Sequence, residues 1–326
     1  MLTWLYLAAA GMLNGSFAVP MKTAKRWSFE HIWAVFSLLA MAVLPWLAVW
    51  TAIPEWRALV SSLPAAGLIR LIVLGLLWGV ASLLYGLGVD ALGVALGISI
   101  QLGLSIVAGA ILPRLWVEAP PVSASSPGIF YSGIGMMVVG VIVCARAGQD
   151  NNAVGSRPNV SRFRRGLIIA VAGGLGAPLL NIGIQYGLSL LPAAGSGTRS
   201  GQWVAWALFL SAAAVTQGSY CFARVIARGE LRQYFRSQVR FEWLRVAVMA
   251  VIWAASIFLY AFSAAALGPL GTSVGWPIFI GLIVVTSNAW GVALGEWKEK
   301  SGSRFRQMLA GSVLLIVATF LVARGR

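Results

Sequence analysis

Residues 78–93 read WGVASLLYGLGVDALG, and residues 253–268 read WAASIFLYAFSAAALG, and the pattern that these two stretches share decides the fold. Both begin with W-x5-L-Y, and both end with Ala-Leu-Gly inside apolar runs long enough to cross a membrane as a helix. Trp78 thus corresponds to Trp253, and Tyr85 to Tyr260. The match indicates that one half of the chain is a copy of the other.

The segments that follow repeat a second pattern. Leu-Gly-x3-Gly-x5-Gly-Leu occurs at 92–104 and again at 270–282. A short insertion before the second occurrence explains why the two occurrences of this pattern lie slightly further apart in the sequence than the two occurrences of the first pattern. Two adjacent matches in the same order favour duplication of a whole unit over chance similarity in a chain rich in Leu, Gly and Ala.

The composition restricts the class of protein. Of the 326 residues, 59% are hydrophobic and 10% are charged, and the mean hydropathy is +0.85. Soluble domains average about 45–50% apolar and about 25% charged residues. This excludes a disordered chain, a collagen and a small disulfide scaffold, and it argues strongly against a soluble enzyme. The alternating strands that build a membrane barrel are absent, so the fold class predicted is an all-α polytopic membrane protein.

Ten segments approach the length of about 20 apolar residues that a spanning helix needs. A unit of five helices has an odd number, so its second copy must enter the membrane upside down. We therefore predict two inverted five-helix repeats, at 1–147 and 166–326, joined by a polar cytoplasmic linker at 148–165. Inverted repeats are typical of secondary transporters, with the binding site near the midplane. The ten segments lie near 2–20, 32–52, 68–88, 92–112, 129–146, 166–191, 203–224, 244–266, 271–294 and 305–323.

The basic residues predict the orientation. A net charge of +15 is compatible with nucleic-acid binding, but eighteen of the 24 Lys and Arg fall in the loops after the odd-numbered segments. Because cytoplasmic loops of membrane proteins are enriched in these residues, both termini are expected outside the cytoplasm. We expect a multi-pass protein of the bacterial inner (plasma) membrane, with the lipid bilayer and no nucleic acid among its partners.

One basic loop has a helical period. In residues 228–242, arginines recur every four positions, and apolar residues fall between them. The pattern predicts a basic amphipathic helix on the inner membrane surface. A solvated connector is the alternative.

Polar and aromatic residues inside the spans are the candidates for a substrate site, because polar groups in hydrocarbon usually face a bundle interior or a wet cavity. Trp78 and Tyr85 share a helix face, and Trp253 and Tyr260 repeat their spacing. Interfacial anchoring of the aromatic residues and helix–helix hydrogen bonds of the amides are the alternatives. The predicted substrate-binding residues are Asn14, Trp78, Tyr85, Gln101, Asn181, Gln185, Trp253, Tyr260, Trp276 and Asn288.

Titratable groups are scarce, and none of the nine acidic residues lies in the middle of a predicted span. Coupling to protons would therefore have to use groups near the cytoplasmic mouth, for which a solvated helix end is the alternative. No nucleotide-binding, hydrolase or metal-ligand motif occurs, and Cys144 and Cys221 suit packing. We expect no enzyme activity, no cofactor and no metal. The proton-coupling candidates are Glu30, His31, Asp90 and Glu296.

Several motifs resemble the L-rhamnose–proton symporter family of the drug/metabolite transporter superfamily. They are the stretch SFAVPMKTAKRWSFEHIW at 16–33, Leu-Pro-Trp at 44–46, Trp-Gly at 78–79 with Tyr-Gly-Leu at 85–87, Ala-Arg-Ala-Gly-Gln at 145–149, and Glu-Trp at 296–297. The resemblance covers nearly the whole chain. It implies ten helices in two inverted five-helix repeats, in agreement with the internal repeat.

The resemblance also implies import of a neutral sugar, L-rhamnose or a related deoxysugar, coupled to protons. We expect this transport to proceed by alternating access around the midplane site. Residues 81–84 and 270–273 depart from the family's pattern, which leaves the sugar open. An exporter of amino acids, drugs or other metabolites on the same fold is the alternative, and so are a facilitator and a receptor that does not transport. A self-contained pair of repeats can work alone, so a monomer is the expected state.

Overall fold

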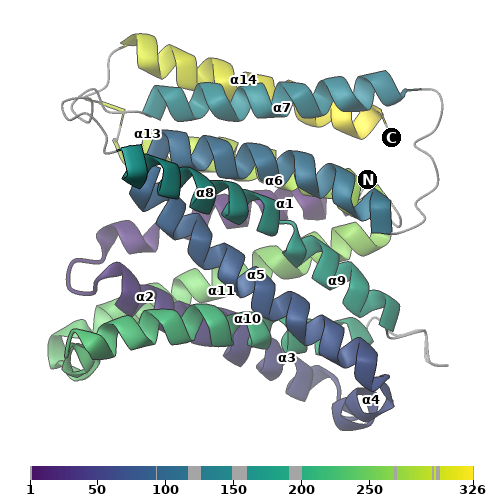
Figure 1. Cartoon of the computed structure of the whole chain (residues 1–326), viewed down its shortest axis with the longest axis vertical. Coiled ribbons are helices and arrows are strands. Elements are labelled where there is room, and N and C mark those ends of the chain that lie inside the picture. The colour runs from purple at the N-terminus through teal and green to yellow at the C-terminus, as the bar shows by residue number, and fades with distance from the viewer. Residues whose placement is uncertain are drawn as a thin grey trace. The chain divides into compact units, whose positions relative to one another are not determined.

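The computed structural model describes residues 2–92, 94–116, 126–148, 160–190, 200–267, 270–295, 297–298 and 302–325. Within these ranges every regular element is a helix (Figure 1). Nine helical segments of this described part are long and apolar enough to cross a membrane. The remaining predicted segment falls on α6 (Val94–Trp116), whose apolar part Gly97–Leu112 is shorter. The class of an α-helical membrane protein is confirmed.

The chain divides into two compact units. Unit 1 comprises Met1–Ser16, Ala81–Pro178 and Phe258–Arg326, and unit 2 comprises Phe17–Val80 and Leu179–Ile257. Unit 1 contains α1 (Leu2–Ser16), α6, α7 (Pro127–Gly148), α8 (Val160–Gly176), α12 (Leu270–Ser273), α13 (Gly275–Ala293) and α14 (Gly302–Arg324). Unit 2 contains η1 (Pro20–Thr23), α2 (Phe29–Phe36), η2 (Ser37–Val43), α3 (Leu44–Ala52), α4 (Trp56–Ser62), α9 (Leu179–Leu190), α10 (Ser200–Ala227), η4 (Leu231–Phe235) and η5 (Ser237–Val239).

Two long helices belong to both units. The helix α5 (Ala65–Leu92) passes from unit 2 to unit 1 after Val80, and α11 (Arg240–Ala266) does so after Ile257. In the sequence match that pairs Trp78 with Trp253, Val80 corresponds to Ala255, close to this second boundary. Each unit thus draws one segment or more from each of the two sequence copies, and the copies at 1–147 and 166–326 remain a prediction.

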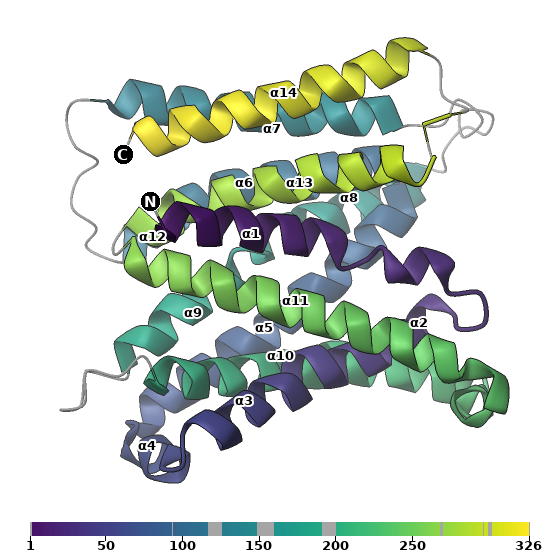
Figure 2. The ribbon, with the colours of Figure 1, turned by 180° about the vertical axis from the view of Figure 1, so that it is seen from behind.

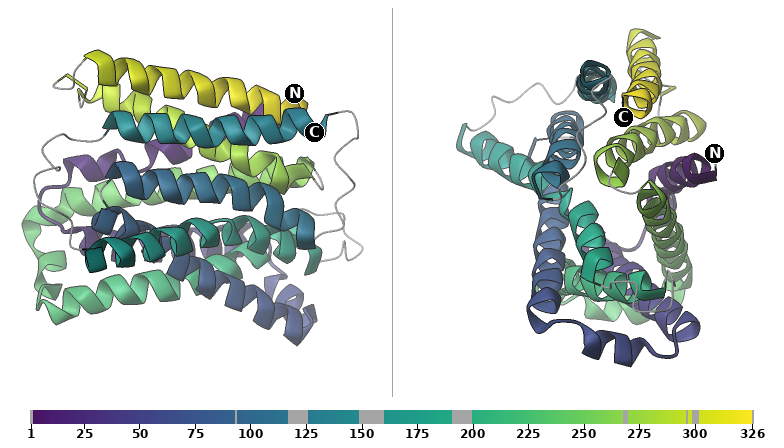
Figure 3. Two further views of the ribbon diagram at one scale, coloured as in Figure 1. Left: turned by 45° about the horizontal axis from the view of Figure 1, so that its top comes forward. Right: turned by 90° about the vertical axis from the view of Figure 1, so that its right-hand side faces the viewer.

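Unit 1 is held together by close helix pairs. The helices α7 and α14 run side by side (Figure 1), and Figure 3 shows the pair from two further directions. The helix α1 lies along α13 (Figure 2), and α6 packs on both α7 and α8. Glycines permit the α7–α14 approach: a Cβ added to Gly311 would lie 2.6 Å from Cys144 Sγ and 3.0 Å from the carbonyl oxygen of Gly140. Small residues let helices associate where lipid gives no hydrophobic driving force.

In unit 2, α10 packs against the run formed by α2, η2 and α3 (Figure 2). The indole nitrogen of Trp46 donates a hydrogen bond of 2.8 Å across this contact to Ser211 Oγ. The run contains a π-helical segment just before Pro45. Proline has no backbone N–H, so the regular α-helical ladder is interrupted there and the preceding turn widens.

The amphipathic helix predicted over 228–242 is wrong. Gly229 has a φ of 69° and ends α10, while the amide of Glu230 donates to the carbonyl of Val225 and that of Gly229 donates to Ile226. This is the Schellman arrangement that stops a helix. Two short 3-10 turns follow, separated by Arg236 in an extended conformation, before α11 begins. The four-residue arginine period belongs to a folded connector instead.

The α7–α14 contact predicts a position that does not accept a larger side chain. Gly311→Leu should lower the midpoint of thermal unfolding in detergent, because overpacking costs about 1–3 kcal/mol. Gly135→Leu on α7 is the matched control, because a Cβ there meets nothing within 4 Å. Equal unfolding temperatures for Gly311→Leu and the unchanged protein would contradict the contact.

Candidate functional site

Two of the three predicted tryptophans, Trp78 and Trp253, lie against each other inside unit 2. The ring centroids of Trp78 on α5 and Trp253 on α11 are 6.2 Å apart, and the ring planes are inclined by 22°. Their exposed fractions are 8% and 6%, so the pair is buried. The indole faces are therefore stacked on each other in this conformation.

Two phenylalanines extend the stack into a row. Phe209 on α10 lies 5.9 Å from Trp78, and Phe36 on α2 lies 5.7 Å from Trp253, edge to face. Gly183 on α9 leaves room for the Phe209 ring. Offset and edge-to-face geometries are those that aromatic rings prefer. The aromatic row, defined as Phe209, Trp78, Trp253 and Phe36, is buried within unit 2.

Amide side chains occur in the same unit. Asn181 is completely buried on α9, and Gln185 lies one helical turn further on the same helix. Within the described residues, Gln185 Nε2 and Gln217 Oε1 are buried without a hydrogen-bond partner. Gln217 was not among the predicted residues, although a single amide in the run AAAVTQGSY was a visible signal. Buried amide groups without partners are suited to bind hydroxyl groups.

In unit 1, Gln101 and Tyr85 are in direct contact. Gln101 Nε2 donates a hydrogen bond of 3.0 Å to the backbone oxygen of Tyr85, while Gln101 Oε1 has no partner among the described residues. Glycines surround the amide: a Cβ on Gly173 would lie 2.6 Å from Oε1, and one on Gly88 would lie 3.0 Å from Nε2. The completely buried amide is thus held between α5, α6 and α8.

Tyr260 and Trp276 also meet in unit 1. Their ring centroids are 5.7 Å apart, and Phe279 lies 4.7 Å from Tyr260. The Trp276 indole nitrogen donates to the backbone oxygen of Ser105, at 3.1 Å. The ring contacts form an aromatic cluster between α11 and α13, and the hydrogen bond joins this cluster to α6.

The two predicted asparagines of unit 1 lie on other helices. Asn288 Nδ2 donates a hydrogen bond of 3.2 Å to Ser312 Oγ and so joins α13 to α14. A hydrogen bond of this kind between helices is the alternative role expected for the amides. Asn14 is half-buried on α1.

A polar cluster in unit 2 contains two of the proton-coupling candidates. His31 is completely buried at the start of α2, with Nδ1 2.8 Å from Ser28 Oγ and 3.8 Å from Glu230 Oε2. Ser28 Oγ donates to Glu30 at 3.0 Å, and Arg228 pairs with Glu30 at 2.7 Å. Ser28 Oγ thus lies within hydrogen-bond distance of both Glu30 and His31 Nδ1, and His31 Nε2 lies 3.4 Å from the backbone oxygen of Glu230. The network thus runs from His31 through Ser28 and Glu30 to Arg228.

Residues of the connector between α10 and α11 also contact His31. Tyr234 Oη donates to the backbone oxygen of His31 at 3.3 Å, and burial raises the pKa of Tyr234 to about 12, so the hydroxyl stays protonated. Trp27 and Tyr234 place rings 6.4 Å and 5.0 Å from the imidazole. Ser28, Arg228 and Glu230 were not predicted, because only the tertiary structure brings residues 28–31 and 228–230 together.

A second ion pair lies beside this cluster. Glu242, with an exposed fraction of 2%, pairs with Arg245 at 3.1 Å and accepts a hydrogen bond from the amide of Lys25. Arg245 Nε also donates to Thr23 Oγ1 at 2.9 Å. The other two candidates, the side chain of Asp90 and residue Glu296, lie outside the described residues.

Comparisons with known proteins show the family of this chain. The family described as L-rhamnose-proton symport protein (RhaT) matches residues 1–326. A protein of Pectobacterium atrosepticum named L-rhamnose-proton symporter is 25% identical and covers 99% of this chain and 96% of its own length. A protein of the same name from Yersinia pestis is 24% identical, covering 95% and 93%.

A solved protein structure resembles the fold. Its TM-score is 0.63 over 98% of this chain and 95% of its own length, at 15% identity, which shows likeness of fold alone. The family match, in contrast, covers every residue of the sequence. The chain belongs to the L-rhamnose-proton symport protein (RhaT) family.

Proposed function

We propose that this protein imports L-rhamnose or a related deoxysugar together with protons, by alternating access. The observation that carries the proposal is the match of the symporter family over the whole chain, together with relatives of that name over nearly their full length. The apolar helices suit a multi-pass protein of a bacterial inner membrane.

The proposed architecture is ten spanning helices in two inverted repeats. Its support is a pair of matching contacts in unit 1. Tyr85 contacts Gln101 in the first copy. The two sequence matches pair Tyr85 with Tyr260 and Gln101 with Phe279, and the rings of Tyr260 and Phe279 are 4.7 Å apart. Positions that the sequence matches pair are thus in contact in both halves of the chain, by a hydrogen bond in one and by ring packing in the other, which supports duplication.

The sugar site that we propose lies at the aromatic row of unit 2. The C–H faces of a deoxysugar are apolar and stack on indole, while its hydroxyls need partners. The row provides stacked indoles, and Gln185 and Gln217 of the same unit have amide atoms without partners among the described residues. The stacked tryptophans represent the site without sugar, and binding replaces the indole–indole contact with an indole–sugar contact.

The proton site that we propose is His31. Histidine is the side chain most often used to move protons near neutral pH. Support comes from its burial and its place in a network: Ser28 connects it to Glu30, and Glu230 lies 3.8 Å from it. Movement of a proton on or off His31 changes the charge facing Glu30, Glu230 and Arg228, which biases this cluster between two arrangements.

Reconstituted protein tests the transport reaction. Proteoliposomes with an imposed inward proton gradient should accumulate labelled L-rhamnose above its external concentration, and a protonophore should reduce this to equilibration. Accumulation that is unchanged by the protonophore would contradict proton coupling. Lack of uptake by correctly folded protein would contradict L-rhamnose as the substrate.

Substitution of the stacked indoles tests the sugar site. Trp78→Ala and Trp253→Ala should each raise the KM for L-rhamnose about tenfold, because loss of ring stacking costs about 1.4 kcal/mol. Trp50→Ala is the control, since Trp50 is 60% exposed on α3. Normal KM values in both variants, with membrane insertion intact, would rule out the aromatic row as the sugar site.

Replacement of the imidazole tests the proton site separately. His31→Gln should abolish accumulation driven by the proton gradient but retain exchange of labelled against unlabelled sugar, because exchange needs no net proton movement. Tyr234→Phe removes the hydroxyl that contacts His31 and should retain both activities. Gradient-driven accumulation by His31→Gln at the level of the unchanged protein would exclude His31 as the proton carrier.

A further inference from the structure

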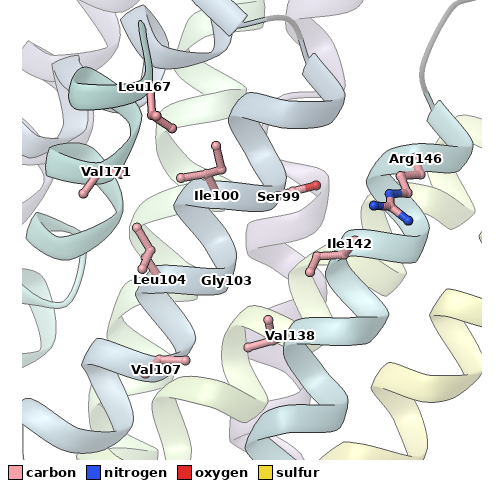
Figure 4. Close-up of a pocket in the computed structure, with 10 residues that line it drawn as sticks. All are labelled: Ser99, Ile100, Gly103, Leu104, Val107, Val138, Ile142, Arg146, Leu167 and Val171. Atoms are coloured by element: carbon pink, nitrogen blue, oxygen red, sulfur yellow. The ribbon is translucent and has the colours of Figure 1, made fainter. Parts of the chain in front are cut away.

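An apolar groove in unit 1 is lined by none of the proposed sugar and proton residues. It runs between α6, α7 and α8 and has a volume of about 630 Å³ (Figure 4). This is within the range of about 300–1,000 Å³ that ligand sites occupy. Ser99 and Arg146 are its polar residues, and the rest of the lining is apolar.

This lining does not suit a sugar. A monosaccharide would place several hydroxyls against Ile, Leu and Val side chains, and each hydroxyl without a partner costs free energy of desolvation. An aliphatic chain has no such groups. The groove therefore fits a hydrocarbon ligand that ends in a group for Arg146.

The polar and apolar parts of the groove lie at opposite ends. In Figure 4, Arg146 and Ser99 are at one end, and Val107 and Val138 are at the other. The groove extends from Ser99 to Val107 along α6 and from Val138 to Arg146 along α7, which is about 12 Å on each helix. One leaflet contributes about 15 Å of hydrocarbon. The groove thus matches the depth of a single leaflet.

Its floor is open because of a glycine. A Cβ added to Gly103 on α6 would meet only Val138 Cγ1, at an ordinary 3.7 Å. Gly103 is therefore not required for close helix packing, unlike Gly311 between α7 and α14. The missing side chain leaves space along α6 that an acyl chain can fill.

The positive charge at the polar end of the groove favours an anionic ligand. Arg146 is exposed in the last turn of α7, and the ion pairs of the described residues involve other side chains. Arg164 and Arg165 are exposed on α8, close in sequence to Leu167, which lines the groove at the same end. Basic residues at the ends of spanning helices attract anionic lipid headgroups.

We propose that this groove binds an anionic phospholipid, with one acyl chain along α6 and α7 and the phosphate at Arg146. The site goes beyond sugar transport, and it does not depend on which sugar is carried. Binding involves no covalent step, and the occupant is a lipid of the surrounding bilayer.

Lipid binding to the purified full-length protein tests the proposal. Phosphatidylglycerol should bind in detergent, as measured by native mass spectrometry, and phosphatidylcholine should bind more weakly. Arg146→Gln should weaken phosphatidylglycerol binding about fivefold. Arg224→Gln is the matched control, since Arg224 is also exposed in the last turn of a helix.

The acyl chain is tested by filling the groove. Gly103→Leu should weaken binding as much as Arg146→Gln or more, whereas Gly135→Leu adds the same volume outside the groove and should bind as the unchanged protein does. Val107→Phe fills the apolar end and replaces Gly103→Leu if that variant does not fold.

Any of four results would overturn the proposal. The first two are equal binding of the two lipids and equal binding by the groove variants and their controls. The third is binding of glycerol phosphate as tight as that of phosphatidylglycerol, which would mark a site for an anion without an acyl chain. The fourth is displacement of the lipid by L-rhamnose, because the groove would then be a sugar site.

Discussion

Hydrocarbon offers no hydrogen-bond partner to a peptide group, and this constraint governs the whole structure. Every spanning segment must satisfy its own backbone, so the described elements are helices. Because lipid is as apolar as Leu, the helices do not associate by hydrophobic burial alone. Close contact at glycines, such as Gly311 against Cys144, and hydrogen bonds such as Trp46 to Ser211 hold them together.

The same constraint makes polar residues in the spans informative. Gln101 is buried with its amide nitrogen bonded to the backbone of Tyr85, and its oxygen has no partner in the described part of the chain. Phe279, at the position that the sequence match pairs with Gln101, packs on Tyr260 instead. The two matched stretches of sequence therefore differ in the chemistry of this contact.

The charged residues that form ion pairs lie near the ends of the helices. The ion pairs Arg228–Glu30 and Arg245–Glu242 both lie where the chain enters or leaves its helices. Each carboxylate has an arginine partner there, which offsets the desolvation of its charge. His31 is buried beside the first of these ion pairs. A titratable group thus lies next to the spans without the free-energy cost of an isolated charge in hydrocarbon.

The sequence by itself determined the membrane class, the helical fold, the approximate spans and the family, because hydropathy, charge distribution and motifs are local properties. It also singled out Trp78 and Trp253 from the spacing of a repeat. Only the tertiary structure decided that their rings stack, that Ser28, His31 and Glu230 meet, and that Gly103 opens a groove. It also replaced a helix expected at 228–242 with short turns. Such features depend on contacts between residues far apart in the chain, which no local pattern encodes.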